Sequence, residues 1–512
     1  MSAFGWKVVH GGKTPPPGEV VRPGERLNWP RTVGLGAQHV VAMFGATFVF
    51  PLIMGLNPNV AIMFSGIATI LFLLIVGGKI PSYLGTSASF VAGVAAIRAQ
   101  GGDSADVTGA ILVSGVLLAA VGVFVHFAGA EKVSRVLPPA VTGAVVMLIG
   151  FNLAPVVAGI YWPQDQWVAL LTATFTIVAA VLFRGFWGRI AIFLGLIFGY
   201  ALSYFNDLVF GAITSPDGTG EVVTRDRISL DAVGGADWVG LPPATVFGGG
   251  PDGADVAGFH GPSFSLTFIV LVLPGVIALI AENAGHVKAV AEMTGDDLDP
   301  YLGRALFGDG VGTALASAFG GSPTTTYAEN IGVMAATRVY STAAYYVAAA
   351  VAILLGFSPK FGALVFSIPN GVLGGITLVL YGMIGLLGAK IWVENRVDFG
   401  NPVNLVPLSA GIIAGVGNVT LEVTDDFEIA GIALGTIFVI VYYHLVRAFG
   451  AQVTIEPQAG GRAYEGGTMM STGNVDTPDG PTSPFRDGTG REGTGRDGTG
   501  RDGTGHEGTG RR

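Results

Sequence analysis

The 512-residue chain contains no cysteine, and only 12% of its residues are charged, whereas soluble domains carry about 25%. The lack of cysteine excludes disulfides, thiolate metal sites and cysteine nucleophiles, and it leaves the redox compartment undecided. Scarce charge, together with a hydrophobic content of 50%, excludes an ordinary soluble enzyme. The composition predicts an all-α polytopic membrane protein. Its net charge of -9 reflects acidic loops and indicates no nucleic acid partner.

Both ends of the chain lack long apolar runs. Residues 1–32 are polar and rich in proline, so we expect a cytoplasmic N-terminal tail without a cleavable signal peptide. From residue 486 to 510 the unit R-[DE]-G-T-G repeats every five residues, once with His506 in place of arginine. Residues 451–512 are therefore predicted to form a disordered, low-complexity cytoplasmic tail.

Between these ends, residues 33–450 are predicted to form a transporter domain in which abundant glycine allows close helix packing. Apolar runs that fit a bilayer core of about 30 Å predict fourteen crossings. They lie at 33–54, 60–77, 82–97, 107–128, 137–154, 167–183, 189–206, 265–287, 302–320, 325–337, 341–357, 370–389, 403–418 and 427–448.

The placement of lysine and arginine predicts the orientation. Ten of them fall in the loops assigned to the inside and four in the outer loops, which favours an even number of crossings and both termini in the cytoplasm. The acidic, glycine-rich loop at 207–264 then lies outside.

The third and tenth crossings differ from the others. Each is short, follows a proline and is crowded with hydroxyl residues, as in IPSYLGTSASFVAG and GSPTTTYAENIG. Interrupted segments at corresponding positions of two seven-segment halves are typical of inverted repeats that meet at a midplane site. Their extended starts are predicted to form short strands whose backbone groups pair with each other or line a cavity.

Glu282 and His286 lie four residues apart in an otherwise apolar crossing, so they share one helix face. Ionisable groups are costly in a membrane and usually functional, which favours a proton-coupling pair. A polar contact between helices is the other interpretation. Zinc ligation has little support, because the seven histidines are scattered and no H-E-x-x-H is present, so we expect no metal site.

Glu329 and Asn330 are predicted to open a half-helix after an extended stretch that includes Tyr327. Helix capping explains the neighbouring threonines but not a glutamate at this depth, which favours ligand binding. Ionised carboxylates accept hydrogen bonds from ring N–H groups, and free backbone amides donate to ring carbonyls. The two glutamates therefore predict a small planar ligand rich in N–H groups, whereas an anion would be repelled.

Three further polar residues in apolar segments are more ambiguous. For Gln38 and His39 in the first crossing, a role in bridging helices is favoured over ligand contact. Tyr381 either presents its ring or hydroxyl to a cavity or packs in the core. The glycine cluster GDGVGTALASAFGG lacks a βαβ context, so it indicates helix packing rather than dinucleotide binding.

These motifs resemble the nucleobase:cation symporter-2 family. The signature N-x-G-x4-T-[RKG] after an acidic residue is matched by Glu329 to Gly332 with Thr337 and Arg338, and the A-E-x-x-G-H pattern is matched by Ala281 to His286. Gln38 and His39 match as well. The similarity covers roughly residues 28–448.

The resemblance implies two inverted seven-segment repeats that form a core and a gate domain. We place the core at about 33–154 and 265–389 and the gate at about 155–206 and 390–448. It also implies a protein of the bacterial inner membrane, often a homodimer, that moves a nucleobase by symport. The coupling ion is expected to be H⁺ rather than Na⁺, without a cofactor and without enzymatic activity.

The resemblance also implies roles for individual residues. Glu282 and Glu329 hold the base, His286 tunes Glu282 in proton coupling, and Ala328 and Ala88 offer backbone contacts. Other positions that line the site in bacterial uracil permeases are occupied here by Thr86, Ser87, Ala46 and Tyr381.

The substrate is predicted from particular positions. Glu329 is similar to the uracil branch, and Ala88 and Ala328 resemble the Rut-type pyrimidine permeases, so uracil, and also thymine, is favoured. Because Ala88 replaces a stacking phenylalanine, it leaves room for a purine such as xanthine. An anion transporter of the same architecture and an intramembrane hydrolase using Glu282 and His286 are the alternatives.

Overall fold

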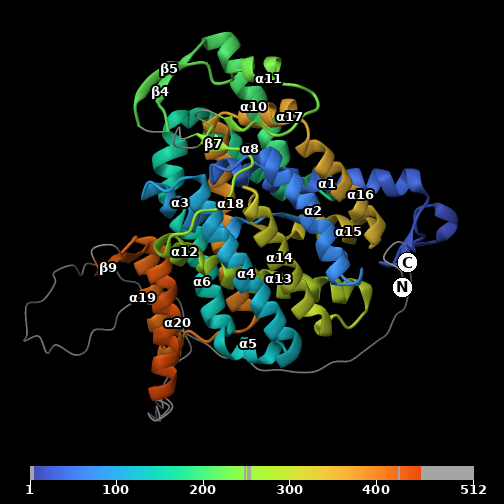
Figure 1. The fold of residues 1–512 in the computed structure, drawn as a ribbon, viewed down its shortest axis with the longest axis vertical. Helices are drawn as coiled ribbons and strands as arrows, with labels where there is room; N and C mark the ends of the chain where they lie inside the picture. Colours follow the sequence, from blue (N-terminus) through green and yellow to red (C-terminus); the bar gives the residue numbers. More distant parts are fainter. Residues whose placement is uncertain (1–4, 219, 247–248, 251–254, 425–426, 451–512) are drawn as a thin grey trace, which may run out of the picture. The chain divides into compact units, whose positions relative to one another are not determined.

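The computed structural model describes residues 5–218, 220–246, 249–250, 255–424 and 427–450, which form a mostly helical domain with short strands (Figure 1). The low-complexity tail predicted at 451–512 lies outside the described residues. The longer helices are α1 (Trp29–Ile53), α2 (Pro58–Ile75), α3 (Val91–Ala99), α4 (Ser104–Ala128), α6 (Pro139–Asn152), α8 (Gln166–Leu182), α10 (Ala191–Phe210), α13 (Pro274–Thr294), α14 (Leu302–Ala318), α15 (Ala328–Thr337), α16 (Thr342–Gly356), α17 (Pro359–Phe366), α18 (Asn370–Glu394), α19 (Pro402–Val416) and α20 (Gly431–Gly450).

Shorter elements connect these helices. Among them are α5 (Ala130–Val136), α7 (Ala154–Val156), α9 (Phe186–Arg189), α11 (Asp231–Gly235), α12 (Leu266–Val272) and the 3-10 helix η2 (Ala88–Phe90). Five strand pairs are described: β1 (Lys7–Val8) with β2 (Glu25–Arg26), β3 (Leu84–Thr86) with β8 (Thr324–Thr326), β4 (Ile213–Pro216) with β5 (Val222–Arg225), β6 (Thr245–Val246) with β7 (Val256–Ala257), and β9 (Thr420–Thr424) with β10 (Phe427–Ala430).

The described helices confirm a multi-pass membrane protein. Eight spans are long and apolar enough to cross a bilayer, and the bent pair α16 and α17, which turns by 82°, makes a ninth. The other five of the fourteen predicted crossings coincide with helices that are shorter or more polar than this, namely α3, α8, α14, α15 and α19. The total of fourteen stays a prediction.

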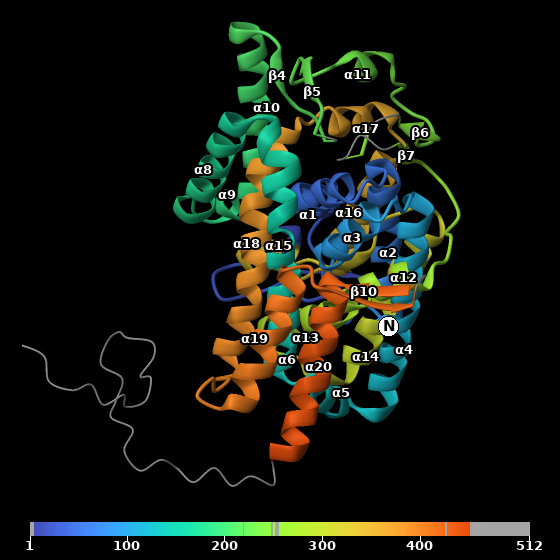
Figure 2. The same cartoon turned by 90° about the vertical axis from the view of Figure 1, so that its left-hand side faces the viewer.

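The helices pack as two groups, which lie on opposite sides in Figure 2. In one group α4 and α2 pack on α14, and α16 packs on α1 and α2. In the other group α6 packs on α18, α19 and α20, and α8 packs on α10 and α18.

Glycine makes the tightest of these packings possible. Gly115 and Gly122 of α4 face the backbone of α14, and a Cβ at Gly122 would collide with Phe307. Gly310, in the glycine cluster of α14, faces the backbone of α4 at Ala119 in the same way. The structure thus confirms helix packing as the role of this cluster.

The N-terminal segment, predicted to be a cytoplasmic tail, packs against the domain. Val21 forms a parallel bridge with Val339, at the junction of α15 and α16. The Arg338 guanidinium donates to the carbonyl oxygens of Pro16 at 2.9 Å and Pro15 at 3.3 Å. Residues 5–28 therefore cover the C-terminal end of α15.

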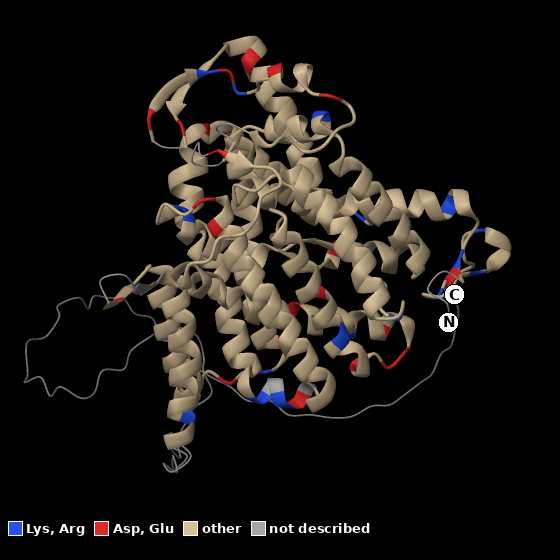
Figure 3. Ribbon diagram, viewed as in Figure 1, with Lys and Arg blue, Asp and Glu red and all other residues tan. Residues whose placement is uncertain are grey.

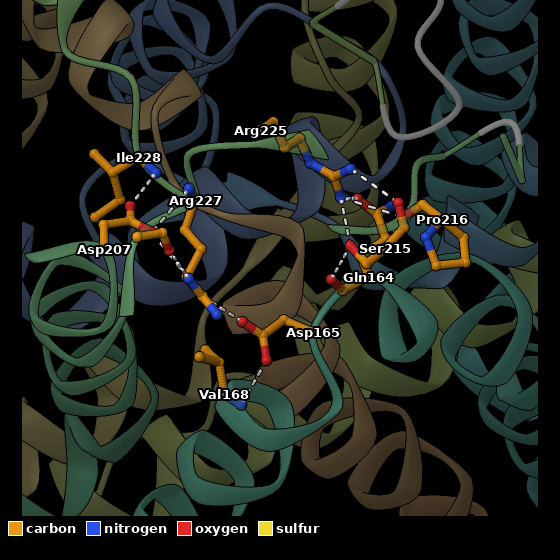
Figure 4. A network of polar contacts seen from close by, with 10 residues as sticks. Gln164, Asp165, Val168, Asp207, Ser215, Pro216, Arg225, Arg227 and Ile228 are labelled. Carbon is orange, nitrogen blue, oxygen red and sulfur yellow. Dashed lines mark hydrogen bonds and ion pairs between the residues drawn. The ribbon is translucent and has the colours of Figure 1, made fainter. Parts of the chain in front are cut away.

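Charged residues lie mostly in the loops and at the helix ends, and most of the length of the helices is free of them (Figure 3). In the long loop at 207–264, Arg227 forms ion pairs with Asp165 at 2.7 Å and with Asp207 at 3.0 Å (Figure 4). All three side chains are at most 14% exposed. The ion pairs fasten this loop to α10 and to the start of α8.

Candidate functional site

The site is organised by two interrupted segments whose strands pair in the middle of the domain. β3 and β8 run antiparallel, with Leu84 opposite Thr326 and Thr86 opposite Thr324, and all residues of both strands are buried. Beyond the strands, the Ser87 N–H donates to the Pro323 carbonyl oxygen at 2.8 Å. The backbone groups of the two extended starts thus satisfy each other, which confirms the predicted strands.

Helices begin where these strands end. η2 begins at Ala88 and continues into α3, and α15 begins at Ala328, so Glu329 occupies the first turn of a half-helix as predicted. The N-terminal ends of both half-helices leave unpaired N–H groups and carry a partial positive charge. This arrangement suits ligand oxygen atoms.

The two predicted glutamates meet beside this break. Glu282 of α13 lies close enough to Glu329 for their charges to interact. Both side chains are half-buried, whereas the adjacent Asn283 and Asn330 are fully buried. Among the described residues, no side chain donates a hydrogen bond to the Glu329 carboxylate. Each carboxylate therefore keeps surface that a ligand can contact.

The two alanines also keep accessible surface. Ala328 is exposed and Ala88 is half-buried, although Thr86, Ser87 and Tyr327 beside them are buried. Small side chains at these positions leave the backbone of both half-helices open to a neighbouring molecule.

His286 does not take Glu282 as its hydrogen-bond partner. Its Nδ1 lies 2.7 Å from the hydroxyl oxygen of Thr326 in β8, and that hydroxyl donates onward to Asn283 Oδ1 at 3.3 Å. The i, i+4 spacing places His286 on the face of α13 that carries Glu282, but β8 holds the imidazole.

A third carboxylate, Asp309 of α14, was missed by the sequence analysis. It is fully buried, and it accepts hydrogen bonds from Asn283 Nδ2 at 2.7 Å and from the Thr324 hydroxyl at 3.2 Å. Its charge also reaches Glu282. The sequence could have indicated it, because Asp309 is an ionisable residue in the predicted crossing 302–320, and ionisable residues within membrane segments are usually functional.

Tyr327 locks the strand pair. Its hydroxyl donates to the Thr86 carbonyl oxygen at 2.7 Å and accepts from Thr47 at 3.2 Å. A side chain at Gly85 would collide with the Tyr327 ring. The hydroxyl groups of Thr86 and Ser322 are 2.8 Å apart, and Ser87 caps η2 by accepting from the N–H of Ser89. Thr86, Ser87 and Tyr327 are thus placed to support the site.

Asn330 links the second half-helix to the first crossing. Its Nδ2 donates to the His39 carbonyl oxygen at 3.0 Å and lies 3.2 Å from His39 Nδ1, and the His39 ring packs on Tyr345 at 4.3 Å. His39 is buried, and Gln38 beside it is half-buried. This geometry agrees with the bridging role favoured for His39.

The last two predicted residues lie in the surrounding core. Ala46 of α1 is 8% exposed, and Tyr381 of α18 is 2% exposed and packs in the hydrophobic core. The Tyr381 hydroxyl is buried without a hydrogen-bond partner among the described residues. An unsatisfied buried hydroxyl is uncommon in a native structure and is available to a ligand.

Together these residues form a recognition surface with negative charge on one side and free backbone donors on the other. The residues that the structure describes contain no group of three or more histidine, aspartate or glutamate side chains arranged to hold a metal ion. The arrangement can bind a ligand that donates to carboxylates and accepts from backbone N–H groups.

Comparison with known proteins agrees with these features. The model described as "Permease family" matches residues 30–424. The chain is 42% identical over 443 residues to the Escherichia coli (strain K12) protein named "Putative pyrimidine permease RutG", covering 85% of this chain and 94% of that protein. It is 35% identical to the uracil permease of Bacillus caldolyticus, covering 79% of this chain and 89% of the permease.

A solved structure shares the fold at low sequence identity. The transmembrane domain of the bicarbonate transporter BicA from a cyanobacterium superposes with a TM-score of 0.51 and 14% identity. The match covers 81% of this chain and 96% of BicA's domain.

Proposed function

We propose that this chain, which belongs to the nucleobase:cation symporter-2 family, carries a pyrimidine nucleobase into the cell together with a proton. The family consists of transporters and not of enzymes, which removes the intramembrane hydrolase from consideration. We place the protein in the bacterial inner membrane. Uracil is the favoured substrate, and thymine is a second one.

The observation that carries this proposal is the meeting of Glu282 and Glu329 beside two half-helix N-termini. Uracil presents ring N–H groups, which the carboxylates accept, and ring carbonyl oxygens, which backbone N–H groups at Ala88 and Ala328 can donate to. Hydrogen bonds to a charged group contribute roughly 1.5–3 kcal/mol each, so a ligand that satisfies both glutamates gains affinity and specificity.

The relatives support a pyrimidine over a purine. The names of two similar proteins refer to pyrimidine and to uracil, and their similarity extends over most of the chain. Ala88 leaves space beside the site, so xanthine is the second candidate substrate.

Proton coupling is supported by the polar chain behind the glutamates. His286, Thr326, Asn283 and Asp309 are joined by successive hydrogen bonds that begin one helical turn from Glu282. A proton that arrives with the substrate can neutralise one of the crowded carboxylates, which lowers the cost of carrying them through the membrane.

Movement of the two helix groups against each other is the transport step that we propose. The packing favours a gate that contains α6 and α18, since these helices pack on each other and on α8 and α19. The boundaries drawn from the sequence at 154 and 389 would leave both helices in the core. Two inverted repeats and a homodimer remain part of the proposal.

An anion transporter is the alternative from another substrate class, because BicA shares the fold. Glu282, Glu329 and Asp309 argue against it, since three acidic groups near one site repel an anion.

Uptake of labelled uracil into proteoliposomes tests the proposal. We expect uptake to rise with an inward proton gradient and to stay unchanged when a sodium gradient is imposed at constant pH. Uptake that depends on neither the pH gradient nor the membrane voltage would contradict proton coupling. Unlabelled thymine and xanthine serve as competitors, and stronger competition by xanthine than by uracil itself would contradict the pyrimidine assignment.

A further inference from the structure

Residues 238–241, in the middle of the long loop at 207–264, form an apolar segment that is called the tip below. Trp238 is 76% exposed, Val239 83% and Leu241 69%, which makes these side chains among the most exposed large apolar groups in the described chain. Contiguous apolar surface of this kind is unfavourable in water and marks a contact with an apolar medium or partner.

The tip is attached where a membrane helix ends. The Gly240 N–H donates to the Phe357 carbonyl oxygen at 2.9 Å, directly after the last residue of α16. The Lys360 N–H donates to the Asp237 carbonyl oxygen at 2.9 Å, at the start of α17. Because α17 turns by 82° from α16, it runs across the ends of the crossing helices beneath the long loop, as Figure 2 shows.

A cation accompanies the tryptophan. Lys360 Nζ lies 5.2 Å from the centre of the Trp238 ring and donates to the Val233 carbonyl oxygen at 2.9 Å. Tryptophan and lysine side by side are typical of the membrane–water boundary, where the ring meets the headgroups and the ammonium group extends toward water and phosphate.

The sequence of the loop changes character at the same place. Asp226, Asp231 and Asp237 precede the tip, whereas residues 238–250 contain no charged residue. Charge is thus absent from the tip and from the residues that directly follow it.

The apolar surface continues from the tip onto the membrane helices. Leu354 of α16 is 70% exposed, Phe357 36% and Leu364 of α17 44%. The exposed faces of crossing helices in a membrane protein meet lipid, and the tip lies next to such an apolar face.

From this continuity we propose that the tip is a membrane anchor. Trp238, Val239 and Leu241 enter the headgroup region of the leaflet on the side where the long loop lies, and Lys360 faces lipid phosphate. The anchor, together with the Arg227 ion pairs at the other part of the loop, fixes the long loop at two places. This inference is independent of the substrate and of proton coupling.

The absence of cysteine allows a direct test. A spin label is attached to the single-cysteine variant V239C in liposomes, and its accessibility to oxygen and to an aqueous nickel chelate is measured. E221C, in the exposed part of the β4–β5 hairpin, is the aqueous control, and L354C is the lipid-facing reference. We expect the oxygen-to-nickel ratio at V239C to be several-fold above that at E221C and below that at L354C.

Two results would overturn the anchor. One is a ratio at V239C equal to that at E221C, which would place the tip in water. The other is exclusion of both reagents that disappears when the protein is diluted with an excess of lipid, which would identify a second copy as the partner. The melting temperature of each labelled variant shows whether it is folded, and uracil uptake is measured separately. If every variant retains the fold but none transports uracil, the proposed substrate fails and the anchor test still holds.

Discussion

Asn283 donates a hydrogen bond from Nδ2 to Oδ2 of Asp309 at 2.7 Å, and this contact joins α13, which carries Glu282 and His286, to α14. The amide oxygen of Asn283, Oδ1, accepts a hydrogen bond from the Thr326 hydroxyl, so the amide lies between a buried carboxylate and the strand that precedes the second half-helix. The position of α13 relative to β8 therefore depends on a polar network, not on apolar packing alone.

The first prediction concerns Asp309. In Asp309→Asn, one acceptor oxygen becomes an NH₂ group that faces the amide of Asn283 or the hydroxyl of Thr324. An unsatisfied buried group costs about 1–3 kcal/mol, so we expect a lower melting temperature and strongly reduced uptake. Thr313→Val serves as the control, because Thr313 also lies on α14 and its hydroxyl also bonds to Thr324 of β8. This variant should disturb uptake less. Equal effects of the two variants would show that Asp309 only supports the fold.

The second prediction concerns Glu329. Glu329→Gln replaces an ionised acceptor by a neutral amide, and we expect uracil binding to weaken by roughly 1–3 kcal/mol. The melting temperature without ligand should change little, because no side chain among the described residues donates to this carboxylate. Equilibrium binding of labelled uracil measures the effect. Unchanged affinity would assign Glu329 to the fold instead.

The third prediction separates His286 from its hydrogen-bond partner. His286→Ala removes the imidazole, and Thr326→Val removes only the hydroxyl that lies 2.7 Å from it. If the chain from His286 to Asp309 carries the proton, both variants should change the pH dependence of uptake more than the affinity for uracil. A pH profile that is unchanged in both variants would exclude this route.

Local composition was sufficient to predict two site residues and the two interrupted helices. Glu282 and Glu329 stood out because charge is rare in apolar segments, and prolines with clustered hydroxyl groups predicted that β3 and β8 interrupt their helices. Asp309 is also a charged residue in an apolar segment, but its glycine neighbours indicate helix packing, which is correct for the glycines and incomplete for the aspartate.

Other features were set by contacts between distant segments. The spacing of Glu282 and His286 favoured a direct pair, but the register of β8 places Thr326 against the imidazole. The N-terminal segment was predicted to be a cytoplasmic tail because it is polar and rich in proline, and its packing against α15 could not be predicted. Its contacts use backbone carbonyl oxygens, such as those of Pro15 and Pro16, and residue type does not reveal these.

The fourth prediction concerns the ion pairs of Arg227. Burial alone would lower the pKa of the guanidinium, but hydrogen bonds and charge from Asp165 and Asp207 raise it above its usual value. A raised pKa keeps the stabilising charge fully present at neutral pH, and the contribution is lost only as the pH rises beyond the ordinary pKa of arginine. Arg227→Met should therefore lower the melting temperature equally from pH 6 to pH 8.

Breaking buried ion pairs costs about 3 kcal/mol or more, whereas exposed pairs contribute about 0–1 kcal/mol. Arg135→Met is the matched control, because the ion pair of Arg135 with Glu131 is highly exposed, and we expect almost no effect there. A melting temperature of Arg227→Met equal to that of the unmodified protein would show that the long loop is held by other contacts.

The fifth prediction concerns Arg338, the residue that caps the C-terminal end of α15. Glu329 lies in the first turn of the same helix. The φ of Arg338, 57°, lies in the left-handed region, which glycine adopts without strain. This conformation explains why the family signature accepts glycine at the same position. Arg338→Gly should therefore preserve the turn between α15 and α16 while removing both hydrogen bonds to the N-terminal segment.

We expect Arg338→Gly to loosen residues 5–28 from the end of α15, so hydrogen exchange should increase at the amides of Val21 and Tyr340, which donate to the carbonyl oxygens of Arg338 and Val21. If the N-terminal segment positions the half-helix, the KM for uracil should rise although Glu329 is intact. Lys13→Ala removes an exposed cation from the same segment and should change neither exchange nor KM. Faster exchange without a change in KM would show that the segment covers α15 but does not position Glu329. Arg338→Ala should be less stable than Arg338→Gly, because it loses the same hydrogen bonds and still carries a Cβ in the left-handed conformation.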